Sequence, residues 1–287
     1  MVELRNTTFF PEAVNGQNTN VDASFASALA YNWIHESFFN YDKTFGEKHV
    51  VSGLLGFSAQ KWARPNERIE GQLANSLIPT LNNLGGLESI DLANTYTQDQ
   101  NDHALASFFG RATYAYDDKY LFAATYRRDG SSRFGTQNRW GGFPSLSLGW
   151  RFGNESFMEG LSFINDAKIR FSTAITGNER INNRDFDFLL SNSNFYQGLN
   201  GVGLTNQLGN PAIQWEETQQ TNFGLDMSFL KSKINLTIDY YEKSTSRLLA
   251  NLPLPALTGF GQTRVNIGDV ENKGIEIAIN ATPIATT

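Results

Sequence analysis

Apolar and polar side chains alternate in long segments of this chain, and this period-two pattern constrains the fold more than any other feature. Between Phe143 and Phe152, the residues Leu146, Leu148 and Trp150 fall on one face, and serine, glycine and arginine fall on the other. Successive side chains of a β-strand point to opposite faces of its sheet. The segment is therefore predicted to be a strand with one apolar face and one polar face.

The same alternation recurs along the chain and predicts nine strands and no α-helix. It is clearest in the second half of the chain and less regular in the three strands nearest the N-terminus. A helical period fits these windows poorly. The predicted strands lie at about 33–44, 49–62, 104–116, 122–127, 143–152, 168–175, 222–229, 234–241 and 275–280.

Shorter and longer connections alternate between these strands. Short turns are predicted at 45–48, 117–119 and 231–233, and a medium connection at 153–166. The longer segments, rich in Asn, Gly and Ser, lie at 63–103, 130–142, 177–213 and 245–270. An antiparallel up-and-down meander with a short-turn rim and a long-loop rim produces this order, and outer-membrane barrels have such rims.

Alternation alone does not separate a membrane barrel from a soluble antiparallel sheet that covers a core. Strands of about 10 residues suit a tilted membrane-spanning strand, and aromatic residues near strand ends suit a membrane–water interface. Charged residues in mid-strand suit a wet lumen. The charged positions are Arg151, Arg170, Asp226, Asp239 and Glu276.

The alternative fold is a soluble extracellular β-sandwich, which would serve as a carbohydrate-binding module. The two folds differ in what covers the apolar face of the sheet. In a sandwich a second protein layer buries this face, whereas in a barrel it meets hydrocarbon. The residues that decide between them are Leu146, Leu148, Ile169, Phe171, Leu236 and Ile238.

Composition argues against several functions. The net charge is −6 with no basic tract, so nucleic acid is not an expected partner. Cysteine is absent and the three histidines are far apart, so no metal site or cofactor is expected. Ser131 lies near Asp129 and Arg133 but has no histidine beside it, so we do not expect an enzyme. No apolar run reaches the length of a transmembrane helix, and no signal peptide is recognised at the start.

Several blocks of sequence resemble the barrel domain of SusC/RagA-like TonB-dependent outer-membrane transporters. The stretch SFFGRATYAYDDKYLFAATYRRDGSSRFG, residues 107–135, is similar to a signature hairpin of that family. Further blocks are NRWGGFPSLSLGWR at 138–151, KIRFSTAITGN at 168–178 and NPAIQWEETQQTNFGLDMSFL at 210–230. The last is LPLPALTGFGQTRVNIGDVENKGIEIAIN at 252–280. These blocks occur in family order and cover most of the chain after Ser107.

The resemblance implies TonB-dependent import of a large nutrient, an oligosaccharide or a peptide, across the outer membrane of a Gram-negative bacterium. The implied partners are outer-membrane lipid, a SusD-like surface lipoprotein and the TonB–ExbB–ExbD complex. Residues 1–287 would form part of a barrel of about 22 strands, without the plug, the TonB box and the C-terminal strands. Because its free edges would leave unpaired backbone groups, we expect the isolated chain neither to insert nor to transport.

The substrate-binding candidates lie on or beside the predicted outer loops. Aromatic faces there stack on sugar rings or peptide side chains, and arginines orient polar groups of a substrate. Loop packing or an interfacial girdle is the alternative role for the aromatic residues, and pairing with Asp129 is the alternative for the arginines. The candidates are Arg127, Arg133, Trp140, Phe195, Tyr196 and Trp215.

Overall fold

The computed structural model of the chain describes residues 21–73, 87–90, 96–98, 102–196 and 199–282. By contacts the chain divides into two compact units. The first contains residues 1–34, 60–104 and 190–204, and the second contains residues 35–59, 105–189 and 205–287. The candidate site described below lies in the second unit.

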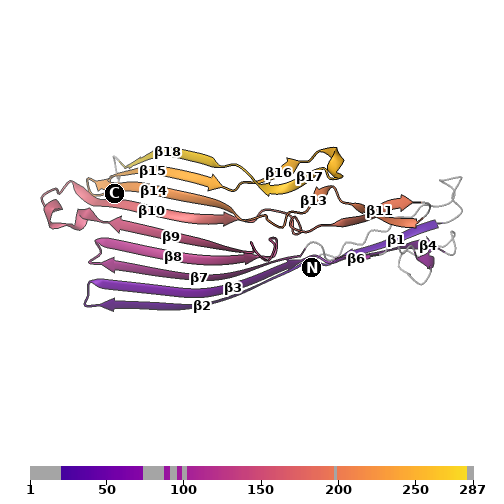
Figure 1. Cartoon of the computed structure of the whole chain (residues 1–287). Helices are drawn as coiled ribbons and strands as arrows, with labels where there is room; N and C mark the ends of the chain where they lie inside the picture. The colour runs from indigo at the N-terminus through magenta and orange to yellow at the C-terminus, as the bar shows by residue number, and fades with distance from the viewer. Residues whose placement is uncertain (1–20, 74–86, 91–95, 99–101, 197–198, 283–287) are drawn as a thin grey trace. The chain divides into compact units, whose positions relative to one another are not determined.

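Nine strands form the main sheet, in the order β2–β3–β7–β8–β9–β10–β14–β15–β18. Figure 1 shows them lying side by side in chain order, so the predicted nine-stranded meander is confirmed. They contain 11 to 15 residues each, as long as a tilted membrane-spanning strand requires. Their bounds are β2 (Tyr31–Phe45), β3 (His49–Ala63), β7 (His103–Tyr116), β8 (Tyr120–Ser131), β9 (Trp140–Trp150), β10 (Ile164–Asn178), β14 (Glu216–Phe229), β15 (Ile234–Ser246) and β18 (Val270–Ala281).

In the register of the sheet, the apolar faces of seven neighbouring strands form one continuous band. The strands are β7, β8, β9, β10, β14, β15 and β18. Residues directly opposite each other on paired strands lie on the same face, and two adjacent rows of the sheet are apolar or aromatic throughout. One row runs through Tyr114, Phe122, Leu148, Phe171, Phe223, Tyr240 and Ile275. The next runs through Tyr116, Tyr120, Trp150, Ile169, Leu225, Ile238 and Ile277.

Among the residues that the structure describes, no second layer of protein covers this apolar face. Leu148 is 43% exposed, Ile169 is 45% exposed and Ile277 is 64% exposed. The six residues that distinguish a barrel from a sandwich are all intermediate or exposed. A β-sandwich would bury them, so the described residues do not provide the facing layer that the sandwich alternative requires.

Tight turns connect strands at one end of the sheet, which we call the turn rim. Gly46 and Glu47 have φ angles of 55° and 64°, and Asp117 and Asp118 have φ angles of 51° and 53°. Two successive residues with positive φ are typical of the type I′ turn, whose twist matches that of a hairpin. The β14–β15 turn lies at the same rim (Figure 1). The predicted medium connection between β9 and β10 contains two short 3₁₀-helices, η3 (Phe152–Asn154) and η4 (Ser156–Met158).

Further short strands that were not predicted lie in the long segments expected to be loops and, for β1, before the first long strand. These strands have two to eight residues and no clear apolar alternation. In the first unit, β4 pairs with β1, β5 and β6, and β11 pairs with β12. In the second unit, β17 pairs with β13 and β16, beside η5 (Ala256–Thr258). The bounds are β1 (Val21–Ala28), β4 (Asn66–Leu73), β5 (Leu87–Ile90), β6 (Tyr96–Gln98), β11 (Leu190–Tyr196), β12 (Leu199–Leu204), β13 (Gln207–Leu208), β16 (Leu249–Pro253) and β17 (Gln262–Asn266).

None of the helices in the described part of the chain has the length and apolar character that crossing a membrane would require.

Candidate functional site

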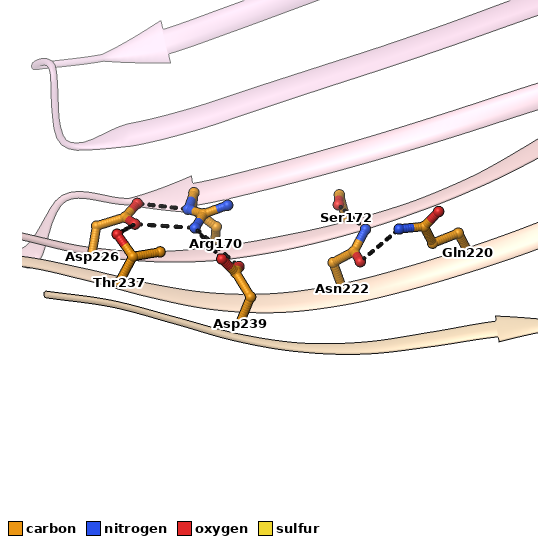
Figure 2. Close-up of polar contacts among 7 residues, drawn as sticks. All are labelled: Arg170, Ser172, Gln220, Asn222, Asp226, Thr237 and Asp239. Carbon is orange, nitrogen blue, oxygen red and sulfur yellow. Dashed lines mark hydrogen bonds and ion pairs between the residues drawn. The ribbon is translucent and has the colours of Figure 1, made fainter. Parts of the chain in front are cut away.

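A cluster of charged residues spans three strands on the polar face of the main sheet. Arg170 on β10 donates from Nε to Oδ2 of Asp226 on β14 at 2.6 Å, and from Nη2 to Oδ1 of the same carboxylate at 3.1 Å. Its Nη2 also donates to Oδ1 of Asp239 on β15 at 3.0 Å. Figure 2 shows the guanidinium lying between the two carboxylates. One planar cation thus ties three strands together, which suits the forked geometry of arginine.

The cluster depends on a glycine in β14, the strand that lies between β10 and β15. Gly224 lies opposite Arg170 on one side and opposite Asp239 on the other. A β-carbon at this position would lie 2.7 Å from Cζ of Arg170 and 2.5 Å from Oδ1 of Asp239. The absence of a side chain on β14 therefore leaves the space in which the guanidinium reaches β15.

Uncharged polar side chains continue along the same face. Asn222 donates from Nδ2 to Oγ of Ser172 at 3.3 Å, and Gln220 donates from Nε2 to Oδ1 of Asn222 at 3.0 Å (Figure 2). Thr237 donates to Asp226 at 3.2 Å. Hydroxyl, amide and paired charged groups can hydrogen-bond to polar solutes and to water. The described residues contain no group of three or more potential metal ligands.

At the end of the sheet opposite the turn rim, connecting segments enclose a small hydrophobic core, which we call the loop core. It brings together residues that are up to 81 positions apart in the sequence, and the ring centroids of Phe134 and Trp215 are 5.0 Å apart. Phe134 and Ile213 are fully buried. The loop core consists of Phe134, Phe143, Ile181, Ile213 and Trp215.

A buried carboxylate joins two of these segments. The side chain of Asp185 is 4% exposed and accepts from Nε of Arg264 at 3.3 Å. It also accepts from the backbone and side-chain nitrogens of Asn182 at 3.0 Å each, and from Gln207 at 3.1 Å. Asn210 donates to the carbonyl of Arg264 at 2.8 Å. Asp185 thus connects the β10–β14 segment to the β15–β18 segment through the hydrogen bonds that its side-chain oxygens accept.

Arg127 lies on the polar face of β8, beside the loops, with 41% of its side chain exposed. Its Nε donates to both carboxylate oxygens of Asp129, at 2.7 and 2.9 Å, and its Nη2 donates to Ser107 at 2.8 Å. The pairing with Asp129 that the sequence suggested as an alternative is therefore present. The rest of the guanidinium still faces solvent and the ring of Phe109, which lies 5.4 Å away.

Arg133 and Trp215 connect the loops to one another. Arg133 donates to Asn183 at 3.0 Å and to the carbonyl of Glu179 at 3.3 Å. Trp215 is 5% exposed and donates from its indole to the carbonyl of Arg139 at 3.2 Å. Their observed contacts are packing and bracing of loops, and substrate binding by either remains a prediction.

Trp140 lies on the other face of the sheet, together with the apolar band. It is opposite Gly130, is 42% exposed, and has the guanidinium of Arg128 5.5 Å from the centre of its ring. An exposed indole beside a cation at the border of an apolar band is typical of an interfacial aromatic girdle. The two other candidates, Phe195 and Tyr196, end strand β11, and their side chains lie outside those that the structure describes.

Phe134, Asp185 and Arg264 organise the loops, although none of them was predicted to do so from the sequence. Asp185 and Arg264 lie 79 positions apart, so no local spacing reveals their pairing. An acidic residue next to aromatic residues in a loop, RDFDF at 184–188, is the single local signal that could have attracted notice.

A long-stranded sheet with an uncovered apolar face and a hydrogen-bonded polar face defines a class of protein, the membrane β-barrel wall. The family described as "TonB dependent receptor-like, beta-barrel" matches residues 3–283. The chain belongs to this family, and its likeness to SusC and RagA is confirmed by the relatives below.

Curated relatives match the chain over a fraction of their own length. The chain is 44% identical to "TonB-dependent receptor P39" of Formosa agariphila over 274 residues, which cover 95% of this chain and 26% of the relative. It is 38% identical to "TonB-dependent receptor SusC" of Bacteroides thetaiotaomicron over 67% of this chain and 21% of the relative. The chain thus spans about a quarter of the length of the curated relatives that it matches.

The fold is similar to that of a solved structure titled "Structure of the RagAB peptide transporter". The TM-score is 0.78 at 22% sequence identity, and the match covers 98% of this chain and 31% of the other. A related structure, "Structure of the RagAB peptide importer in the 'open-open' state", matches with a TM-score of 0.70 at 22% identity, over 93% of this chain and 29% of the other. At this identity the likeness supports the barrel fold alone.

Proposed function

We propose that this chain forms part of the wall of a TonB-dependent importer in the outer membrane of a Gram-negative bacterium. The observation that carries the proposal is the division of the main sheet into two faces. The apolar band is uncovered and suits hydrocarbon, whereas the charges of the other face satisfy one another as they would beside a water-filled lumen. The cargo is a large nutrient, an oligosaccharide or a peptide.

The wall segment acts together with other parts of the transporter, because the curated relatives are much longer than this chain. In the proposal, residues 1–287 belong to the barrel domain alone, and the plug and the TonB box lie in the rest of the transporter. The TonB–ExbB–ExbD complex supplies the energy, and a SusD-like lipoprotein covers the outer mouth. A nine-stranded sheet by itself has two edges whose backbone groups lipid cannot satisfy. The isolated chain therefore neither inserts nor transports, and efficient solute flux into liposomes that contain it would contradict this.

Among the candidate binding residues, Arg127 has the position that best suits contact with cargo. It lies on the polar face, half-exposed, near the loops, and its pairing with Asp129 pre-orients the guanidinium. Trp140 serves in the aromatic girdle, and Arg133 and Trp215 hold the loops in the shape that the cargo meets. Phe195 and Tyr196 remain candidates for stacking on cargo.

The orientation of the two faces can be tested with adjacent cysteines, because residues 1–287 contain no cysteine and any cysteine elsewhere in the transporter can first be replaced by serine. In the complete transporter, Leu236→Cys and Thr237→Cys are each labelled with bimane and reconstituted with doxyl-labelled phospholipid. We expect strong quenching at position 236 and little at 237, because neighbouring strand residues point to opposite faces. Equal quenching at the two positions would overturn the membrane-wall assignment.

Transport is tested by uptake in cells that lack the transporter and are complemented with it. Labelled oligosaccharides and labelled peptides are supplied separately, in strains with and without TonB. We expect TonB-dependent uptake of one of these classes, and Arg127→Ala should reduce it while Arg128→Ala, on the opposite face, should not. TonB-independent uptake, or uptake of neither class, would contradict the proposed function.

A further inference from the structure

A shallow hollow of about 310 Å³ lies on the apolar face, near the turn rim, across strands β7, β8, β9 and β10. Its volume is at the lower end of the range for small-molecule sites in proteins. Apart from Leu121 and Gly149, the residues around it belong to the apolar band, so its occupant must itself be apolar. They include Tyr114, Tyr120, Leu148, Trp150, Ile169 and Phe171.

The end of the hollow at the turn rim is polar, and a single carboxylate organises it. Oε1 of Glu155 accepts from the hydroxyl of Tyr120 at 2.8 Å and from the indole of Trp150 at 3.2 Å. Nζ of Lys119 lies 3.6 Å from the other oxygen of Glu155 and 3.4 Å from Asp117. Two rings that line the hollow are thus held in place by the same group that meets the charged rim.

Hydrogen bonds from Tyr120 and Trp150 hold the pKa of the Glu155 carboxyl below its usual range. The carboxyl is therefore ionised at neutral pH and available as an acceptor. Beside it, the exposed ring of Phe157 in η4 lies 6.5 Å from the ring of Trp150 and extends the apolar surface toward the rim.

Charges of both signs lie around this end, and among the groups that form ion pairs the carboxylates outnumber the cations by one. Among the described residues, the ion pairs of the rim join three cations to four carboxylates. An anionic headgroup would meet this excess unfavourably, whereas an ammonium group would find carboxylates and its phosphate would find lysine. The cations are Lys48, Lys119 and Arg151, and the carboxylates are Asp117, Asp118, Glu155 and Asp166.

We propose that this hollow is a binding site for one phospholipid with a primary ammonium headgroup, phosphatidylethanolamine. An acyl chain lies in the hollow against Leu148 and Phe171. The ammonium lies beside Glu155 and Asp117, and the phosphate lies beside Lys119. The inference rests on the proposed function, because the apolar face must meet hydrocarbon for lipid to reach the hollow.

The test measures lipid retained by the complete transporter in native mass spectrometry. The protein is equilibrated with equal amounts of phosphatidylethanolamine and phosphatidylglycerol that have identical acyl chains. We expect one retained phosphatidylethanolamine, preferred over phosphatidylglycerol by roughly tenfold, the effect of one charge-assisted hydrogen bond. Equal retention of the two lipids would overturn the proposal.

Two variants test the apolar hollow and its polar end separately. Leu148→Trp fills the hollow and should abolish selective retention, whereas Leu236→Trp, on the same face but outside the hollow, should leave it unchanged. Glu155→Gln leaves the hollow open and should reduce the preference to about twofold or less. Should Leu148→Trp fail to assemble, Ile169→Trp replaces it. Unchanged selectivity in the filled variant would also sink the proposal.

The bimane experiment described above distinguishes this failure from failure of the proposed function. If Leu236→Cys is quenched by lipid but the two phospholipids are retained equally, the proposed lipid site is wrong and the proposed membrane wall is retained. If Leu236→Cys is not quenched, both the proposed lipid site and the proposed function are wrong.

Discussion

At the scale of residues, glycines determine which side chains can enter the polar face. Phe143 is 8% exposed and packs edge-on against Trp215, with ring centroids 5.4 Å apart. It occupies space beside Gly141 and Gly177, where a β-carbon would overlap its ring. The loop core therefore attaches to the sheet through a ring that only glycine neighbours admit.

The first prediction concerns this attachment. In Gly177→Ala, the new methyl group would collide with the buried ring of Phe143, and we expect a loss of about 1–3 kcal/mol of stability. Gly53→Ala on β3 is the matched control, because a β-carbon there has nothing within 4 Å. Urea unfolding of the complete transporter in detergent measures both, and equal midpoints for the two variants would contradict the packing argument.

The second prediction concerns the three-strand charge cluster. Asp226 is bound through two nitrogens of Arg170, whereas Asp239 is bound through Nη2 alone. We therefore expect a double-mutant cycle of Arg170→Gln with Asp226→Asn to give a larger coupling energy than one with Asp239→Asn. About one third of each side chain is exposed, so both couplings should be about 1 kcal/mol or less. A larger coupling to Asp239 would reverse the assignment.

At the scale of elements, the main sheet could be predicted from sequence and the loop structure could not. In each of the nine long strands, apolar and polar residues alternate within the strand itself. A short window of sequence is therefore enough to predict the strand and its apolar face. The strands within loops depend on partners far away: Asn266 donates to the carbonyl of Gln214, 52 positions earlier, at 2.9 Å. No window of the sequence contains both members of such a pair.

The candidate site shows the same limit. The pairing of Arg127 with Asp129 was foreseeable, because residues two apart in a strand share a face. The burial of Trp215 was not, because it depends on Phe134 from another loop. Likewise, Trp140 could be assigned to the apolar face only once the register placed it opposite Gly130.

The third prediction treats the loop core as one element. Phe134→Ala removes a fully buried ring and should cost about 3–5 kcal/mol within the loops. The β-sheet should remain paired, because Phe134 lies outside its strands. Limited proteolysis should therefore cut the loops of this variant faster while the barrel fragment survives. Phe188→Ala, at a ring that is 66% exposed, is the control and should be cut at the parent rate.

At the scale of the whole molecule, the two ends of the main sheet have different chemistry. At the turn rim, tight turns and ion pairs such as Lys48–Asp117, at 3.4 Å, hold the strand ends close to the sheet. At the other end, long segments build the loop core and the Asp185 cluster. In outer-membrane barrels, short turns face the periplasm and long loops face outward. The position of the short turns and long loops therefore predicts that the turn rim faces the periplasm and that the loop core faces outward.

The last prediction tests that orientation in intact cells. Leu257→Cys places a thiol on η5 in the long-loop region, where the native side chain is 99% exposed. Glu159→Cys places one at an exposed position of the β9–β10 connection at the turn rim. A maleimide joined to a polymer too large to pass porins is added to cells that make the transporter without its lipoprotein partner. We expect Leu257→Cys to react in intact cells, and Glu159→Cys to react only after the outer membrane is permeabilised. Both positions are exposed in this chain, and reaction of both after permeabilisation shows that a difference in intact cells arises from the membrane between them. Labelling of Glu159→Cys but not Leu257→Cys in intact cells would invert the orientation, and with it the side of the membrane on which the loop core lies.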